Sequence, residues 1–213
     1  MVKTSLVIWD WNGTLLDDTA LCYSIANHMR QERGMPPLAD IETYRGLFRF
    51  PVIEYYRDMG YTFETESYED ISVEFVSEYA RRLSECALQP HALTTLSAVR
   101  ASGRRQVLLS ATGADRLAAQ AAQFGVDGLF DDIVGAENNL AGGKAAQACA
   151  LIADCGVQPD EVLFVGDTDH DYQVSRAAGC RCLLLTCGHQ PAERLAALCA
   201  PLIDDLSAVL PAL

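Results

Sequence analysis

The chain has 213 residues, of which 50% are hydrophobic and 21% are charged, an ordinary composition for a globular protein with one large domain or a domain carrying an insertion. Sixteen basic and 29 acidic residues give a formal net charge of −13. This charge argues against nucleic acid or an anionic membrane surface as a partner, since both repel an acidic protein. A phosphate ligand would have to be attracted by local positive groups or by a metal ion.

The eight cysteines and the hydropathy of the chain bear on its compartment. The cysteines are scattered through apolar patterns, and no CxxC pair occurs among them. We find no signal peptide and no run of about 18 apolar residues. We therefore expect mostly buried free thiols, no membrane partner and a reducing, cytoplasmic location.

The first predicted element is a short apolar strand that ends in a carboxylate. Leu6 to Trp9 read as a buried parallel strand, Asp10 follows at its carboxyl end, and Gly13 allows a sharp turn just after it. In open α/β sheets, ligands bind outside the carboxyl ends of the strands. Asp10 is therefore placed to act as a nucleophile or to hold a metal ion.

Residues 17–88 are predicted to form an all-helical block without a convincing strand. Helices are expected over residues 18–33, 40–48, 51–59 and 67–87. Because the block follows the first strand directly, it can lie over Asp10 as a lid that excludes water and contacts substrate.

From residue 90 onward, strands and helices alternate. Strands are expected over residues 105–110, 132–136, 161–166 and 181–186, and helices over 91–102, 114–124, 143–155, 170–178 and 191–199, before a short C-terminal strand and helix. The alternation predicts an α/β fold with a doubly wound parallel sheet. We expect residues 1–16 and 89–213 to form this core and residues 17–88 to form a helical cap.

Four segments fall at the carboxyl edge of this sheet: Asp10-Trp11-Asn12-Gly13-Thr14, Ser110, Lys144 and the acidic loop Gly166-Asp167-Thr168-Asp169-His170-Asp171. Their order, spacing and placement resemble the haloacid dehalogenase superfamily of hydrolases. The phosphoglycolate phosphatase-like branch, which carries a helical cap after the first strand, is most similar. The resemblance covers essentially the whole chain. It implies a hydrolase of small phosphorylated metabolites.

The resemblance assigns the chemistry to the first and last of these segments. Asp10 would attack phosphorus and form an aspartyl-phosphate, which divides a difficult step into two. Asp10 and Asp167 offer the hard oxygen ligands that suit Mg²⁺. In the family, the residue two positions after the nucleophile binds the metal ion through its backbone carbonyl, which Asn12 can still do.

Further residues would bind the phosphate or support the site. The Ser110 hydroxyl and the backbone N–H at Ala111 can bind phosphate oxygens, and Lys144, one of only two lysines, can neutralise the phosphoryl charge. Asp171 would orient metal-bound water or Lys144, and Thr14 is expected to support the site from outside the metal ligands.

Two cap arginines are candidates for substrate contacts. Arg45 and Arg49 could grip a carboxylate or phosphate of the substrate, or they could form surface ion pairs instead.

Asn12 departs from the family pattern. Phosphatases of this superfamily normally carry Asp at this position, where it protonates the leaving alcohol and then activates water. An amide cannot exchange a proton near neutral pH, and general acid–base catalysis is worth about 10²–10⁴-fold. We therefore expect a slow phosphatase, one that uses acyl or aryl phosphates, or one in which Asp17, Asp18, His170 or a cap residue supplies the proton.

Two alternatives to a phosphatase remain open. The first is a phosphate-ligand sensor or interaction protein with little or no catalysis. The second is a C–P or C–halogen hydrolase. Residues 17–88 contain no lysine for the Schiff base that relatives cleaving C–P bonds require, and the acidic loop at residues 167–171 disfavours the metal-independent dehalogenases.

Overall fold

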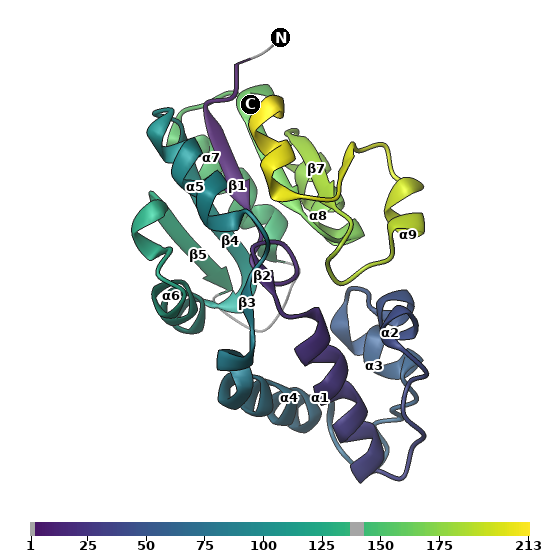
Figure 1. Cartoon of the computed structure of the whole chain (residues 1–213). Coiled ribbons are helices and arrows are strands. Elements are labelled where there is room, and N and C mark those ends of the chain that lie inside the picture. The colour runs from purple at the N-terminus through teal and green to yellow at the C-terminus, as the bar shows by residue number, and fades with distance from the viewer. Residues whose placement is uncertain (1–2, 137–142) are drawn as a thin grey trace.

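The computed structural model describes residues 3–136 and 143–213, and its centre is a six-stranded parallel sheet (Figure 1). Residues 1–2 and 137–142 of the predicted core lie outside the described residues. The strand order is β5-β4-β1-β6-β7-β8. The strands are β1 (Leu6–Trp9), β4 (Arg105–Gly113), β5 (Asp132–Ala136), β6 (Val162–Gly166), β7 (Arg181–Leu185) and β8 (Leu202–Ile203). The predicted α/β fold with a parallel sheet is confirmed.

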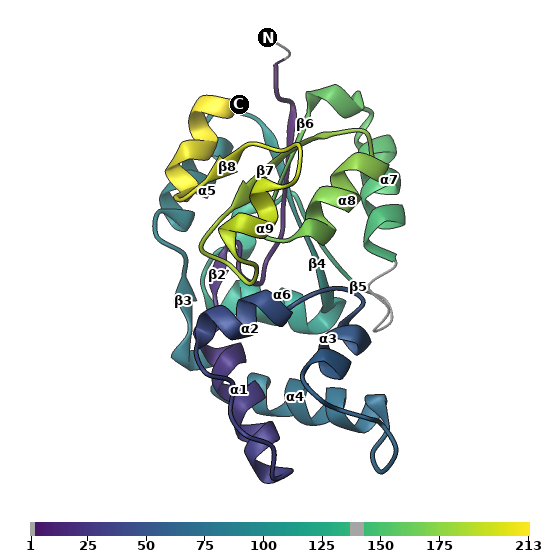
Figure 2. The ribbon, with the colours of Figure 1, turned by 90° about the vertical axis from the view of Figure 1, so that its right-hand side faces the viewer.

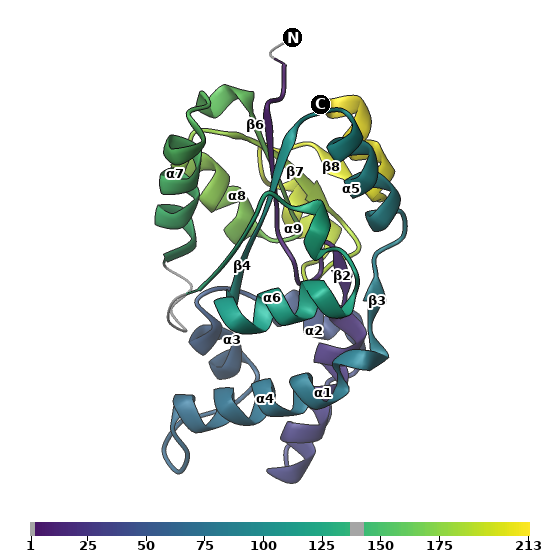
Figure 3. The same cartoon turned by 90° about the vertical axis from the view of Figure 1, so that its left-hand side faces the viewer.

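Helices cover both faces of the sheet because the central strand is apolar on both sides. Leu6 and Ile8 of β1 belong to one hydrophobic cluster, and Val7 and Trp9 belong to another. The core helices are α5 (Ala92–Ala101), α6 (Ala114–Gln123), α7 (Lys144–Cys155), α8 (Asp169–Ala177) and α9 (Ala192–Ala196). Helices α7 and α8 lie together on one face, while α5 lies on the other beside the C-terminal 3₁₀ segment Leu206–Ala212 (Figures 2 and 3).

The helical cap lies beyond the carboxyl ends of the strands (Figure 1). Its helices are α1 (Thr19–Glu32), α2 (Ile41–Leu47), α3 (Val52–Asp58) and α4 (Tyr68–Arg82). The chain passes between core and cap through β2 (Leu16–Asp17) and β3 (Ala87–Leu88), which pair antiparallel. The division of the chain at residues 16/17 and 88/89 stays a prediction, and these two short strands lie at its proposed boundaries.

The structure corrects two element predictions. The helix expected over 67–87 ends at Arg82, and a 3₁₀ turn (Leu83–Glu85) precedes β3. The block expected to contain no strand therefore includes β3 and one residue of β2. The reason is tertiary: Leu88 pairs with Leu16, and the Gln89 N–H donates to the Leu15 carbonyl, so pairing across the chain overrides local helix preference.

The cysteines only partly follow expectation. All eight are free thiols, and Cys22, Cys180 and Cys182 are buried, but Cys149 and Cys199 are exposed. Among the described residues, no helix is both long and apolar enough to cross a membrane. The cytoplasmic location stays a prediction.

Candidate active site

Three predicted site residues lie at or near the carboxyl ends of adjacent strands. Trp9 of β1 pairs with Leu108 of β4 on one side and with Val165 of β6 on the other. Ser110, Asp10 and Asp167 follow these positions on the three strands, and all three are buried. The Asp10 N–H donates to the Val165 carbonyl at 2.9 Å, which fixes the direction in which the chain leaves β1.

Lys144 joins two of the predicted carboxylates. It is the first residue of α7 and is 4% exposed. Its Nζ lies 2.5 Å from Asp10 Oδ1 and 2.7 Å from Asp171 Oδ1. The second oxygen of Asp171 accepts from the Thr168 hydroxyl at 2.7 Å and from the Thr168 N–H at 3.0 Å. Asp171 is thereby held in place, and it orients the lysine toward Asp10.

Asp167 is held from two sides. Its Oδ1 accepts from the Thr14 hydroxyl at 2.8 Å, and its Oδ2 accepts from the His189 N–H at 2.7 Å. Gly13 passes directly beside it with φ = +75°, and a Cβ at that position would lie 2.3 Å from Asp167 Oδ2. Only glycine fits there, which explains the turn after β1 in both conformational and steric terms.

The cluster carries more negative than positive charge. Asp10, Asp167 and Asp171 each offer an oxygen within 4.8 Å of the others, and the Lys144 ammonium pairs with two of them, Asp10 and Asp171. Burial raises the pKa of Asp10 to about 8 and that of Asp167 to about 6, and repulsion from Asp171 adds to both shifts. Burial alone would also raise the pKa of Asp171, but the charge and hydrogen bond of Lys144 hold it below its usual value. A buried group of oxygen ligands with excess negative charge suits a divalent cation.

Asn12 is fully engaged in hydrogen bonds. Its Nδ2 donates to Asp18 Oδ2 at 2.7 Å and to the Tyr79 hydroxyl at 2.9 Å. Its Oδ1 accepts from the Thr112 hydroxyl at 2.9 Å. The amide therefore lies between the end of β4 and the cap helix α4.

A buried ion pair lies next to Asn12. Asp18 Oδ1 is 3.1 Å from His189 Nε2, and both side chains are buried. Burial would raise the pKa of Asp18, but the charge of His189 and the hydrogen bonds from His189, Asn12 and Tyr79 hold it below its usual value. Burial would lower the pKa of His189, yet the charge of Asp18 and its hydrogen bond raise it above normal. Both groups are therefore favoured in their charged forms.

His189 also contacts the cap. Its Nδ1 lies 2.9 Å from the Tyr44 hydroxyl of α2, and its ring stacks on Phe48 with centroids 4.8 Å apart. The loop after β7 thus joins the Asp167 side of the site to the helical cap.

The remaining predicted residues are placed as follows. Ala111 lies half-buried within β4, which runs three residues beyond the predicted end of the strand. Arg45 donates to the Cys187 carbonyl at 2.8 Å and to Glu42 at 2.8 Å. Arg49 pairs with Asp58 at 2.7 Å. Both arginines already have partners, and their role in binding substrate stays a prediction.

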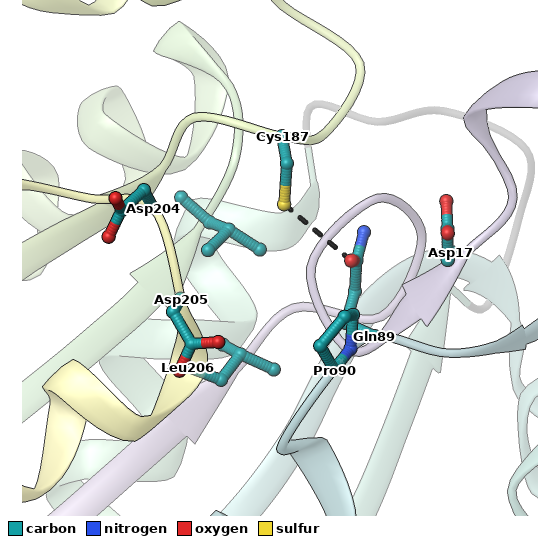
Figure 4. A pocket seen from close by; sticks show the side chains of 8 residues that line it. Asp17, Gln89, Pro90, Cys187, Asp204, Asp205 and Leu206 are labelled. Carbon is teal, nitrogen blue, oxygen red and sulfur yellow. Dashed lines mark hydrogen bonds between the residues drawn. The ribbon is translucent and has the colours of Figure 1, made fainter.

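A pocket of about 280 Å³ lies outside the acidic cluster (Figure 4). Its lining includes Gln89, Cys187, Asp204 and Asp17, one of the candidates for the missing acid, and the pocket is not lined by Asp10, Lys144 or Asp167. Gln89 accepts from the Cys187 thiol at 3.5 Å and donates to the Gly13 carbonyl at 3.2 Å. Through these two hydrogen bonds, Gln89 links the Cys187 side of the pocket to the Asp10–Thr14 loop.

A family model described as haloacid dehalogenase-like hydrolase matches residues 7–185 of this chain. The chain belongs to this family. A phosphoglycolate phosphatase from Pseudomonas putida is 28% identical over 215 residues, covering 97% of this chain and 78% of the relative. One from Chromobacterium violaceum is 29% identical over 204 residues, covering 90% and 89%. The structure of a haloacid dehalogenase-like family protein from Streptococcus pneumoniae superposes with a TM-score of 0.84 at 20% identity, covering 100% of this chain and 99% of that one.

These matches confirm the predicted resemblance to the haloacid dehalogenase superfamily and its phosphoglycolate phosphatase-like branch, and the prediction of a phosphatase-like enzyme. The geometry brings Asp10, Lys144, Asp167 and Asp171 of this hydrolase into one cluster, with Thr14 bound to Asp167.

Sequence reasoning missed three side chains of the site. His189, Tyr79 and Thr112 were not singled out as functional residues. His189 follows the carboxyl end of β7, so the same edge rule that located Asp167 could have placed it near the site. Tyr79 and Thr112 carried no comparable signal, because the first lies on the apolar face of a helix and the second on an extended strand.

Proposed function

We propose that this hydrolase removes phosphate from small phosphorylated metabolites in a Mg²⁺-dependent reaction, with Asp10 as the nucleophile. The observation that carries the proposal is the pairing of the buried Asp10 carboxylate with the Lys144 ammonium at 2.5 Å, beside Asp167 at the edge of the sheet. An anionic nucleophile can approach an anionic phosphoryl group only where positive charge is supplied locally, since the protein as a whole is acidic.

Each side chain then has a chemical task. An Asp10 oxygen forms a bond to phosphorus while the bond from phosphorus to the leaving oxygen breaks, and the leaving group departs with the electron pair. Lys144 reduces the repulsion between Asp10 and the phosphoryl oxygens. The Ser110 hydroxyl and the Ala111 N–H bind those oxygens. Water then hydrolyses the aspartyl-phosphate and restores Asp10.

The residues present fit a divalent cation. Asp10, Asp167 and the backbone carbonyl of Asn12 would hold Mg²⁺, which prefers a few carboxylate and carbonyl oxygens together with water and phosphate. When bound, the ion neutralises charge on the phosphoryl group. Thr14 and Asp171 hold the carboxylate and the lysine in position.

Asn12 shapes the expected substrate preference. Without a carboxyl group at this position, we expect acyl and aryl phosphates, whose leaving groups need little protonation, to react faster than alkyl phosphates. Because two relatives are named phosphoglycolate phosphatase, 2-phosphoglycolate is the first alkyl phosphate to test. Helices α1–α4, in the predicted cap, would close over the substrate.

A second function is favoured by the same amide. A protein that binds a phosphorylated ligand without turning it over would keep Asp10, Lys144 and Asp167 and could lose the acid at position 12. Fluoroberyllate binding that depends on Asp10, without phosphate release from any substrate, would favour this sensor.

The test measures phosphate release from acetyl phosphate, p-nitrophenyl phosphate and 2-phosphoglycolate with MgCl₂. Asp10→Asn should reduce release to background for every substrate. Asp115→Asn is a matched control, because Asp115 is an exposed carboxylate in α6 with no proposed role in the site. The proposal fails if Asp10→Asn turns over as fast as Asp115→Asn.

A further inference from the structure

The hydrogen bonds of Asn12 fix its amide in one orientation. Both acceptors near it, Asp18 Oδ2 and the Tyr79 oxygen, face Nδ2, and the Thr112 hydroxyl faces Oδ1. If the amide were turned over, its oxygen would face the Asp18 carboxylate at 2.7 Å with no proton between them. The surroundings therefore require a donor on the cap side of residue 12.

Asp18 is the source of that requirement. This carboxylate is fully buried at the N-terminus of α1. Its Oδ1 accepts from the Gly13 N–H at 2.8 Å and pairs with His189 Nε2 at 3.1 Å. Its Oδ2 accepts from the Tyr79 hydroxyl at 2.7 Å and from the Asn12 amide at 2.7 Å. These four groups, together with the Cys22 thiol, which donates to Oδ2 at 3.8 Å, hold Asp18 as a charged acceptor.

A carboxylate at position 12 would conflict with this arrangement. The two oxygens would face each other across 2.7 Å, the present distance from Asn12 Nδ2 to Asp18 Oδ2, and both would be acceptors. Like charges at such a distance repel strongly in a buried site. The negative charge on this side of the site therefore lies at residue 18, and residue 12 must present a neutral hydrogen-bond donor to it, as the Asn12 amide does.

We propose that Asp18 is a positioning residue that determines substrate specificity by imposing the amide at residue 12. Through Asn12 and Tyr79 it also connects the catalytic loop to α4. This inference rests on the proposed phosphatase function. It adds that the preference for leaving groups that need no proton is set by Asp18, so replacing Asn12 alone does not reverse it.

Exchanging the two residues provides the decisive variant. In Asn12→Asp/Asp18→Asn, the amide introduced at position 18 can turn its oxygen toward Gly13 and His189 and its NH₂ toward position 12. The carboxylate introduced at position 12 can then accept from that NH₂ and from the hydroxyls of Tyr79 and Thr112. Apart from the long contact of the Cys22 thiol with Oδ2, every donor again faces an acceptor, so the exchange preserves the main hydrogen bonds while moving the carboxylate from position 18 to position 12.

The first readout is thermal stability, which does not depend on activity. Asn12→Asp and Asp18→Asn should each lower Tm, and the exchange variant should regain more than half of the summed loss, since neighbours in one network are not additive. Asn27→Asp is a matched control in the cap: Asn27 Oδ1 accepts from the Leu38 N–H, which an aspartate can also do. Additive losses in the exchange variant would overturn the proposal.

The second readout is kcat/KM, which reports the step that expels the leaving group. For an alkyl phosphate, the exchange variant should exceed wild type by at least about 10-fold, because general acid catalysis is worth about 10²–10⁴-fold. For p-nitrophenyl phosphate the change should be much smaller. If Asp18 had a purely structural role, kcat/KM would change by the same factor for both substrates.

Two kinetic outcomes decide the matter. If Asn12→Asp alone accelerates the alkyl phosphate as much as the exchange does, Asp18 does not set specificity and the proposal is wrong. If no variant hydrolyses any phosphate while the Tm of the exchange variant recovers, the proposed function and the specificity role both fail, and only the pairing of residues 12 and 18 stands.

Discussion

Asp10→Asn should stabilise the metal-free protein while it removes activity. Asp10 lies within 4.8 Å of two other buried carboxylates, Asp167 and Asp171, and shares Lys144 with Asp171. An amide of the same shape keeps a hydrogen bond acceptor for Lys144 but carries no charge. The substitution therefore removes repulsion from a site that we propose binds a metal ion and a phosphate, a function that is gained at the expense of stability.

The size of the expected gain in unfolding free energy follows from the distances between Asp10 and its charged neighbours. At an effective dielectric constant of about 20, each like-charge pair within 4.8 Å costs at least about 3.5 kcal/mol, and the contact with Lys144 at 2.5 Å returns about 7 kcal/mol. The two repulsions therefore offset the attraction, which leaves the burial penalty of the Asp10 charge. We expect a net gain of about 1–3 kcal/mol for Asp10→Asn, or a rise of about 3–9 °C in Tm for a chain of this size.

The pH dependence of the stability difference between wild type and Asp10→Asn tests this expectation. Because the pKa of Asp10 is raised from 3.8 to about 8, the folded protein binds more protons than the unfolded chain between these values, and wild-type stability falls as pH rises through this window. Urea unfolding in EDTA should show the advantage of Asp10→Asn growing from about pH 5 to about pH 8. An advantage that is absent, or that shrinks with pH, would refute the reasoning.

Three further predictions concern the metal ion, the lysine and the ion pair. MgCl₂ should stabilise wild type by about 2.7 kcal/mol at 100 times its Kd, and Asp167→Asn should lose most of this gain; equal gains in differential scanning fluorimetry would contradict the metal assignment. Lys144→Met should lower kcat at least about 10²-fold in steady-state assays at saturating MgCl₂, since the apolar chain keeps the volume but not the charge, and near-normal turnover would be the contrary result. His189→Phe should destabilise by about 3–5 kcal/mol near pH 6, because it leaves the charge of Asp18 buried and unpaired. Because the pKa of His189 is raised, the stability that its charged form gives wild type is lost as pH rises above about 6.5 and through the raised pKa. The difference in unfolding free energy between wild type and His189→Phe, measured by urea unfolding, should therefore shrink as pH rises. A difference that grows with pH would count against the ion pair of His189 and Asp18.

The proposed catalytic cluster could be predicted because it depends on a rule of topology. Asp10 and Asp167 each follow an apolar strand, and parallel strands bring their carboxyl ends to one edge. Lys144 was distinctive because lysine is so rare in this chain. For these residues, the local sequence carries enough information to place the side chain.

The connection between cap and core could not be predicted in the same way. Asp18 and His189 are 171 positions apart, and their pairing depends on how α1 and the loop after β7 meet. Asp18 was one of several candidates for the missing acid, but no local pattern distinguished it from Asp17, which the structure places on the surface. Likewise, the bond from Arg45 to the Cys187 carbonyl forms only when α2 docks on that loop.

The two short strands were missed for a related reason. Leu16–Asp17 and Ala87–Leu88 are two residues each, too short for any alternation of apolar and polar residues to be detected. Their pairing is a property of the folded chain, in which the two crossings between core and cap lie side by side.

The covalent state of Asp10 during turnover tests the central claim most directly. After rapid mixing with acetyl phosphate and MgCl₂ and an acid quench, the account predicts an intact mass increased by one phosphoryl group, located by fragmentation to the peptide that contains Asp10, and absent from Asp10→Asn. Phosphate release by wild type with no phosphorylated protein at any quench time, or with the phosphoryl group on another residue, would contradict it.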